Sequence, residues 1–374
     1  AFVPVIITPY YCVIGGWVMK YLFTFLTGSA QASADGGDYF NAFIGFDAGS
    51  IPSTMLDFSG PTPWFLIYVL LTAVVVIFGV EKGIEKASRF MMPVLAVLSV
   101  IVAIYSLTID GAMAGLKYYL LPDFSQFSAS TVLGALGQLF YSMSLAMGIM
   151  ITYGSYMQKE NLLEHSVTQI EVFDTLFAFI AGLMIIPAVV AFNGGDPTAI
   201  NAGPGLMFVT LPMVFESMHF GTIIGAVFFL LVLFAALTSS ISLMETIVSV
   251  VMDKVHIKRK PATLLVTVVV LLVGVPSCLG YGPWAGITII GMQFLDFFDF
   301  ISNSVLMPIV AFLTCILIGH VVGTKVIADE VKEGAGSFHR EALHRVMVRW
   351  IAPILLVVIL ATELATKVFH IFTI

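Results

Sequence analysis

Nine long apolar runs divide the sequence, and each is long enough to cross a lipid bilayer. A hydrocarbon core of roughly 30 Å needs about 20 consecutive apolar residues in a helix. The runs lie at about 1–26, 64–81, 89–109, 132–157, 168–193, 221–251, 262–280, 292–318 and 346–371. Because lipid offers the backbone no hydrogen-bond partners, and because the short alternating strands of a barrel are not seen, these runs must be helices. The sequence therefore predicts an all-α, polytopic membrane protein, with one transmembrane domain over residues 1–374.

The composition agrees with a membrane protein. The chain is 59% hydrophobic and 10% charged, with a mean hydropathy of +1.03, whereas a soluble domain is roughly a quarter charged. Cys12, Cys278 and Cys315 lie far apart and have neither disulfide nor metal-site spacing. The sequence contains no phosphate-binding loop, zinc motif or nucleophile elbow, so it does not favour an enzyme. Its net charge of −7 gives no indication of a nucleic-acid partner.

Basic residues are distributed unevenly between alternate loops. Most of the lysines and arginines fall in one set: Lys82, Lys86, Arg89, Lys159, Lys254, Lys258, Arg259, Lys260, Lys325, Lys332, Arg340, Arg345 and Arg349. The other set holds Lys20, Lys117 and Lys367. By the positive-inside rule the first set is cytoplasmic, which predicts residue 1 on the cytoplasmic side and residue 374 outside. Residues 28–63 and 194–220 then lie outside, and the apolar patches of 194–220 are typical of a folded-back lid.

Polar residues interrupt the apolar run at 132–157. Gln138, Ser142, Ser144 and Gly148 cluster near its middle, where a lipid-facing helix would carry Leu or Ile. Small residues can line close contacts between membrane helices. Alternatively, the helix is broken here, and its freed carbonyls and amides bind an ion or a small polar substrate.

Hydroxyl groups crowd the middle of the run at 221–251. Thr238, Ser242, Glu245 and Ser249 fall on one helical face, with Ser239 and Ser240 beside them. A single hydroxyl in a span usually bonds back to its own helix. This many hydroxyls exceed what back-bonding explains, and neutral oxygens suit a monovalent cation better than calcium.

Carboxylates enter two further spans, and two tyrosines lie in the first span. Asp174 begins the apolar part of 168–193, while Asp296, Asp299 and Asn303 share one face of 292–318. Acids inside a membrane indicate function by default, although both sets could instead be interfacial. Tyr10 and Tyr11 are either interfacial aromatics or buried hydroxyls that need a partner.

Several segments together resemble the bacterial neurotransmitter:sodium symporter family, in the same order across essentially the whole chain. They are YYCVIGGW, GVEKGIEKASRFMMP, GQLFYSMSLAMGIMITYGSYMQK, DTLFAFIAGL, FAALTSSISLME and LDFFDF. The resemblance implies an inverted-repeat, broken-helix fold similar to that of the leucine transporter. The first span here resembles the family's third helix and the last its eleventh. We therefore expect an N-terminally truncated chain without the family's first two helices, one that does not complete the site alone.

The resemblance also implies a set of site residues. Substrate contacts fall on Tyr11, whose hydroxyl would bind the substrate carboxylate, and on Ile7, Tyr141, Ser142, Ser144, Met147, Ser239 and Leu243. One sodium site would use the Ala235 carbonyl with Thr238 and Ser239, and the other Ser142 and Asp174. The outer gate would comprise Asp299, Tyr141 and Gln138, and the inner gate Asp253 and Tyr156.

The function implied by the resemblance is sodium-coupled symport of neutral amino acids through the bacterial inner membrane. Two sodium ions are expected, and chloride is not, because Asp174 supplies the negative charge that relatives with Asn at this position obtain from chloride. Met147 replaces the Phe of several relatives and favours hydrophobic or aromatic L-amino acids, since Met fills irregular space. Ala146 replaces a frequent Gly and would stiffen the break. Two alternatives remain: a proton-coupled transporter in which Glu245 or Asp174 titrates, and a non-transporting membrane scaffold.

Overall fold

The computed structural model describes residues 2–46, 50–158, 162–197, 202–335 and 337–368. Within these ranges the chain is helical and forms no β-strand beyond an isolated bridge between Ile289 and Met292. The α-helices are α1 (Phe2–Leu26), α2 (Asp38–Ile44), α3 (Pro61–Ile77), α4 (Lys86–Leu107), α5 (Ala112–Leu120), α6 (Ala129–Ser142), α7 (Ile149–Gly154), α8 (Leu163–Phe192), α9 (Gly203–Gly205), α10 (Leu211–Glu216), α11 (Gly221–Val255), α12 (Arg259–Gly280), α13 (Phe294–Asp299), α14 (Met307–Ile316), α15 (Thr324–Ala335), α16 (Glu341–Val346) and α17 (Ala352–Lys367). Short 3₁₀ turns occupy Ala30–Ala34, Ser53–Leu56 and Phe124–Gln126, and π-helical segments occupy Val80–Glu85, Leu206–Thr210, Phe300–Leu306, Leu317–Val322 and Met347–Ile351.

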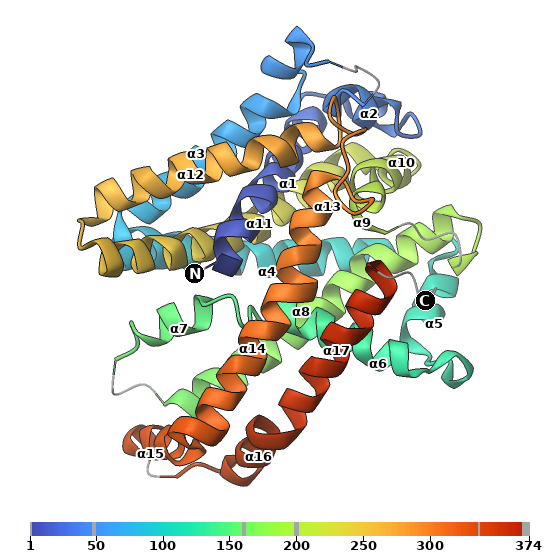
Figure 1. The fold of residues 1–374 in the computed structure, drawn as a ribbon. Helices are drawn as coiled ribbons and strands as arrows, with labels where there is room; N and C mark the ends of the chain where they lie inside the picture. The colour runs from blue at the N-terminus through green and yellow to red at the C-terminus, as the bar shows by residue number, and fades with distance from the viewer. Residues whose placement is uncertain (1, 47–49, 159–161, 198–201, 336, 369–374) are drawn as a thin grey trace. The chain divides into compact units, whose positions relative to one another are not determined.

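Eight helical stretches in the described ranges are long and apolar enough to cross a membrane. They are Phe2–Leu26, Ser53–Ile77, Val80–Leu107, Leu163–Phe192, Gly221–Val255, Arg259–Gly280, Phe294–Val322 and Glu341–Lys367. Each overlaps one of the nine predicted runs, so the all-α, multi-pass architecture is confirmed. The remaining run, 132–157, does not form one continuous helix, because it divides into α6 and α7 (Figure 1).

The interruption between α6 and α7 has identifiable local causes. Helix α6 begins with a capping box, in which Ser128 and Thr131 satisfy each other's backbone amides. It ends in a Schellman motif: the Leu145 amide donates to the Phe140 carbonyl, and the Ser144 amide donates to that of Tyr141. The backbone then visits positive φ at every second residue, with 54° at Ser144, 60° at Ala146 and 87° at Gly148. The prediction of a broken helix is therefore confirmed.

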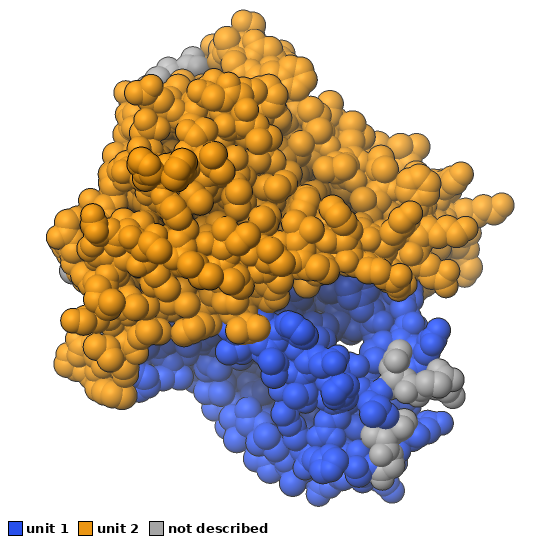
Figure 2. All heavy atoms as spheres, turned by 180° about the vertical axis from the view of Figure 1, so that it is seen from behind, with its two compact units in different colours: residues 1–7, 126–175, 296–374 blue, residues 8–125, 176–295 orange. Residues whose placement is uncertain are grey.

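The chain divides into two compact units, shown in different colours in Figure 2. Unit 1 comprises residues 1–7, 126–175 and 296–374, and unit 2 comprises residues 8–125 and 176–295. The single domain expected over 1–374 stays a prediction. In unit 2, α3 packs along α12, and α11 packs against both α4 and α3. In unit 1, α14 and α17 run side by side (Figure 1).

The segment before α11 folds back onto α1 in unit 2. Tyr21 of α1 donates a hydrogen bond of 2.7 Å to the Phe208 carbonyl. The Phe208 ring stacks on Phe40, with 5.5 Å between centroids, and meets the edge of Trp17. Apolar and aromatic side chains therefore hold this segment against the helices, which confirms the folded-back course predicted for 194–220 within the described residues.

Ion pairs attach the segment between α14 and α17 to the first turns of α8 in unit 1. Glu164 accepts hydrogen bonds from the backbone amides of His339 (3.1 Å) and Arg340 (3.2 Å). The Arg340 guanidinium donates to Glu171 at 2.7 Å. The contact with Glu171 raises the pKa of Arg340, so this cation stays charged at any physiological pH.

Candidate functional site

The first predicted site contact that the structure forms lies in unit 2, between α1 and α11. The Tyr11 hydroxyl is hydrogen-bonded to the Ser239 side chain. Neighbouring Tyr10 is 2% exposed, and Tyr11 is partly exposed. A buried tyrosine hydroxyl requires a polar partner, and α11 supplies one at the height of its densest hydroxyl cluster. The two residues predicted to bind the substrate carboxylate and sodium are therefore brought together.

The oxygens predicted to bind the first sodium ion lie within one turn of α11. The Thr238 hydroxyl donates to the Ala235 carbonyl at 2.9 Å. Ala235 and Thr238 are partly exposed and Ser239 is exposed, whereas Ser240 on the next position is fully buried. Neutral carbonyl and hydroxyl oxygens suit a hard monovalent cation. The residues thus fit a sodium ion in chemistry, and Thr238 retains lone pairs while it donates to its own helix.

Back-bonding explains part of the hydroxyl cluster. Ser240 donates to the Leu237 carbonyl at 3.1 Å, and Ser242 donates to that of Thr238 at 2.9 Å. This is the ordinary behaviour of hydroxyl side chains in membrane helices. Ser239 and Ser240 each contact a side chain of another helix, Ser239 that of Tyr11 on α1 and Ser240 those of Tyr68 and Thr72 on α3.

Glu245 does not join the predicted cation-binding face. Its carboxylate is fully buried and forms a bidentate pair with Arg259 of α12, at 2.6 Å and 2.9 Å. Arg259 also donates to the Val76 carbonyl near the end of α3, at 3.3 Å. The guanidinium thus balances the charge of the one carboxylate on the face that also carries Thr238 and Ser242.

The second predicted sodium site is partly assembled within unit 1. The Ser142 hydroxyl, at the end of α6, contacts both carboxylate oxygens of Asp174 on α8, at 3.0 Å and 2.9 Å. The contact joins the break between α6 and α7 to the carboxylate on α8. Ser142 is exposed and Asp174 partly exposed. The contact places a carboxylate and a hydroxyl together on one potential ion site.

The remaining predicted site residues occupy both units. Ile7, Tyr141, Ser144, Met147, Gln138, Asp299 and Tyr156 belong to unit 1, whereas Leu243 and Asp253 belong to unit 2. Asn303 donates to Asp299 at 2.6 Å, which confirms that these two share a helical face. Met147 is 4% exposed, and Asp253 is exposed near the end of α11. The substrate pocket and both gates stay predictions.

Three residues beside the site were not singled out from the sequence. Tyr68 and Thr72 of α3 contact Ser240 at 3.2 Å and 3.1 Å, and Arg259 binds Glu245. Tyr68 and Thr72 are polar residues one helical turn apart within an apolar run, and this spacing is the feature of the sequence that could have indicated a polar contact on one face of α3. Arg259 was counted as an ordinary basic residue of a cytoplasmic loop.

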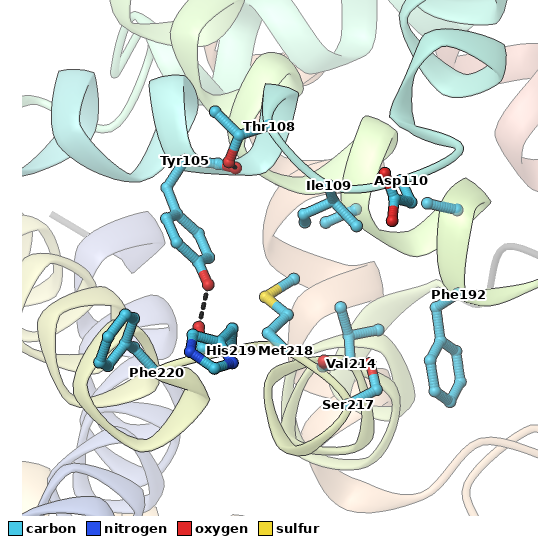
Figure 3. A pocket seen from close by; sticks show the side chains of 12 residues that line it. Tyr105, Thr108, Ile109, Asp110, Phe192, Val214, Ser217, Met218, His219 and Phe220 are labelled. Carbon is cyan, nitrogen blue, oxygen red and sulfur yellow. Dashed lines mark hydrogen bonds between the residues drawn. The ribbon is translucent and has the colours of Figure 1, made fainter.

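A separate cavity of about 620 Å³ lies in unit 2 where α4 ends and α11 begins (Figure 3). The Tyr105 hydroxyl donates to the His219 carbonyl across its wall. Its lining includes Thr108, Ile109, Asp110, Phe192, Ser217, Met218 and Phe220. None of these residues belongs to the predicted sites, and in the described ranges no three His, Cys, Asp or Glu side chains gather to hold a metal ion.

The fold and the paired groups define a class of protein. A multi-pass helical chain with a broken span, and with hydroxyls and a carboxylate placed at that break and in a neighbouring long helix, has the features of a secondary transporter.

Comparison with known proteins identifies the family. The model of the sodium:neurotransmitter symporter family matches residues 47–371. The chain is 35% identical to the sodium-dependent transporter YhdH of Bacillus subtilis, over 89% of this chain and 71% of that protein. It is 32% identical to a sodium-dependent transporter of Haemophilus influenzae, over 96% of this chain and 76% of that protein. The crystal structure of MhsT in complex with L-phenylalanine matches with a TM-score of 0.83 and 36% identity, over 96% of this chain and 79% of that chain. The chain belongs to the sodium:neurotransmitter symporter family, whose members named here are sodium-dependent transporters and not enzymes.

Proposed function

We propose that this protein is a sodium-coupled symporter of neutral, hydrophobic or aromatic L-amino acids in the bacterial inner membrane. The hydrogen bond between Tyr11 and Ser239 carries the proposal, because it joins a group for the substrate carboxylate to a ligand for sodium. The relation to MhsT, which was crystallised with L-phenylalanine, supports an aromatic substrate. Met147 adds a flexible, buried apolar side chain to the proposed pocket.

Ser239 gives a physical route from ion binding to substrate binding. In the proposed site a sodium ion held by Ala235, Thr238 and Ser239 orients the Ser239 hydroxyl. That hydroxyl in turn fixes the Tyr11 hydroxyl that receives the substrate. Two ligands that share one side chain affect each other's affinity reciprocally, and this coupling is what symport requires.

Asp174 and Ser142 form the proposed second sodium site. A carboxylate contributes a fixed negative charge beside the ion, so a second anion is not needed for charge balance. We therefore propose two sodium ions per cycle and transport that is independent of chloride.

The proposed cycle is alternating access around these sites. Sodium stabilises the outward-open state, and the substrate then bridges Tyr11 and the apolar pocket residues Ile7, Tyr141, Ser144, Met147 and Leu243. Tyr141, Gln138 and Asp299 close the outer side, and opening proceeds towards Asp253 and Tyr156. Ligands drive such a cycle only through different affinities for its states.

The pairing of Glu245 disfavours proton coupling through this residue. Both oxygens of the buried Glu245 carboxylate bind the Arg259 guanidinium, so this ion pair accounts for an acid inside the span without a role in proton coupling. The sodium-coupled proposal requires no titration of Glu245.

The proposal is tested by uptake into proteoliposomes that contain the complete gene product. Radiolabelled L-phenylalanine should accumulate under an inward sodium gradient and should not accumulate when choline replaces sodium at fixed pH. Replacement of chloride by gluconate should leave the rate unchanged. Equal uptake in choline would reject sodium coupling, and loss of uptake without chloride would reject the role given to Asp174.

A further inference from the structure

Directly beside Ser239, a fully buried cluster of hydroxyls joins α11 to α3. The Ser240 hydroxyl lies 3.2 Å from the Tyr68 hydroxyl and 3.1 Å from that of Thr72. All three side chains are 0% exposed. Buried hydroxyls in an apolar interior are unfavourable unless they pair, so this cluster fixes α3 and α11 at one relative register.

The protons of the cluster can be assigned in a consistent order. The Thr72 hydroxyl donates to the Tyr68 carbonyl at 3.0 Å, one turn earlier on its own helix. Tyr68 can then donate to Ser240, and the single Ser240 proton is shared between the Leu237 carbonyl and the Thr72 oxygen, each 3.1 Å away. Chains of this kind strengthen each bond by polarising its neighbours.

The same tyrosine ring also contacts α1, which carries Tyr11. A Cβ atom placed on Gly15 would lie 2.3 Å from Cζ of Tyr68, so only a glycine allows the ring to lie this close to α1. Gly15 is one turn beyond Tyr11, which binds Ser239. Successive serines of α11 are thus held by two different helices, Ser239 by α1 and Ser240 by α3.

We propose that Tyr68 and Thr72 are positioning residues of the sodium site formed by Ala235, Thr238 and Ser239. This inference rests on the proposed function. By holding Ser240, they fix the rotation of α11 about its axis at the turn that carries the ion ligands. Without them α11 could rotate by a few degrees, and the ligand oxygens would leave the distances that a small cation requires.

The test compares Thr72→Val and Tyr68→Phe, alone and together, with Thr267→Val as the matched control. Both threonines are buried, but the Thr267 hydroxyl bonds to the Thr263 carbonyl of its own helix α12. The readout is the sodium concentration that half-maximally raises the thermal unfolding temperature of the complete gene product. That concentration should rise by about 3- to 10-fold in each single variant and further in the double variant, because each loses one bond between helices. It should not change in Thr267→Val.

Two further measurements separate positioning from general stability. Thr72→Ser retains the hydroxyl and should restore the sodium affinity. Thr267→Val should lower the unfolding temperature measured without sodium, because a buried hydroxyl bond is lost, but it should leave the sodium affinity unchanged. Unchanged sodium affinity in Thr72→Val and Tyr68→Phe, or an equal loss in Thr267→Val, would overturn the inference. If the double variant does not fold, the sodium affinities of Thr72→Val and Tyr68→Phe are sufficient to test the positioning role. A wild-type protein that binds no sodium would instead reject the proposed function.

Discussion

Two residues of the break between α6 and α7 adopt a backbone conformation that favours glycine. Ser144 and Ala146 have φ of 54° and 60°, and they are two of five such non-glycine residues in the described ranges. The left-handed region is unfavourable for residues with a Cβ by roughly 1–2 kcal/mol. The surrounding contacts, including the Schellman motif at Ser144 and the bond from Ser142 to Asp174, must offset this strain.

Substitution of Ala146 by valine should destabilise the protein, since a β-branched side chain at positive φ is strongly disfavoured. We expect Ala146→Val to lower the free energy of unfolding by about 1–2 kcal/mol. Ala135→Val, on the exposed helical part of α6, should lower it by roughly 0.5 kcal/mol or less. Equilibrium unfolding in mixed detergent micelles measures both values, and equal effects would show that position 146 is not strained.

At the scale of elements, α11 carries two polar functions on different parts of its length. The turn 235–239 bears the proposed sodium ligands, and Ser240, directly after it, contacts Tyr68 and Thr72 of α3. Five residues after Ser240, Glu245 binds Arg259 of α12, which also contacts the Val76 carbonyl of α3. One ion pair thereby connects three helices of unit 2 near the end that the charge distribution assigns to the cytoplasm.

The ion pair should be strongly coupled in a double-mutant cycle. Arg259→Met leaves the fully buried Glu245 carboxylate without its partner and should destabilise by about 3–5 kcal/mol. The double variant Glu245→Met/Arg259→Met removes both charges and should recover most of that loss, since apolar replacement of a buried pair is often close to neutral. Free energies of unfolding for the four proteins test this, and additive losses would show that the pair is not coupled.

At the scale of the whole molecule, sequence periodicity and length predicted the fold well. The spans were predictable because lipid requires about 20 apolar residues for each helix, and every one of the eight uninterrupted stretches overlaps a predicted run. The break was predictable because Ser142, Ser144 and Gly148 are poor choices for a lipid-facing helix. The family was correctly indicated by short motifs that resemble those of the neurotransmitter:sodium symporters and occur in the same order along the chain. This evidence does not depend on hydrophobic periodicity.

The sequence was less informative about partners that lie far apart along the chain. Tyr68 is 172 residues from Ser240, and Arg259 follows Glu245 across the turn between two helices. Side-chain pairing of this kind depends on how helices pack, which periodicity does not encode. Glu245 was consequently grouped with the hydroxyls of its own helical face, whereas its charge is satisfied by the next helix.

The proposed symport depends most on α11 as a sodium-binding element, and one paired measurement tests this directly. The sodium concentration for half-maximal L-phenylalanine uptake is compared in the wild type, in Thr238→Ala/Ser239→Ala, and in the control Thr263→Ala/Thr267→Ala, whose hydroxyls bond within α12. If α11 binds sodium, this concentration should rise by at least about 10-fold, or sodium stimulation should be lost, in the α11 variant alone, since two hydrogen-bonding oxygens contribute roughly 1 kcal/mol each. Membrane insertion should be equal in all three. Sodium dependence in the α11 variant that equals that of the wild type would contradict the account.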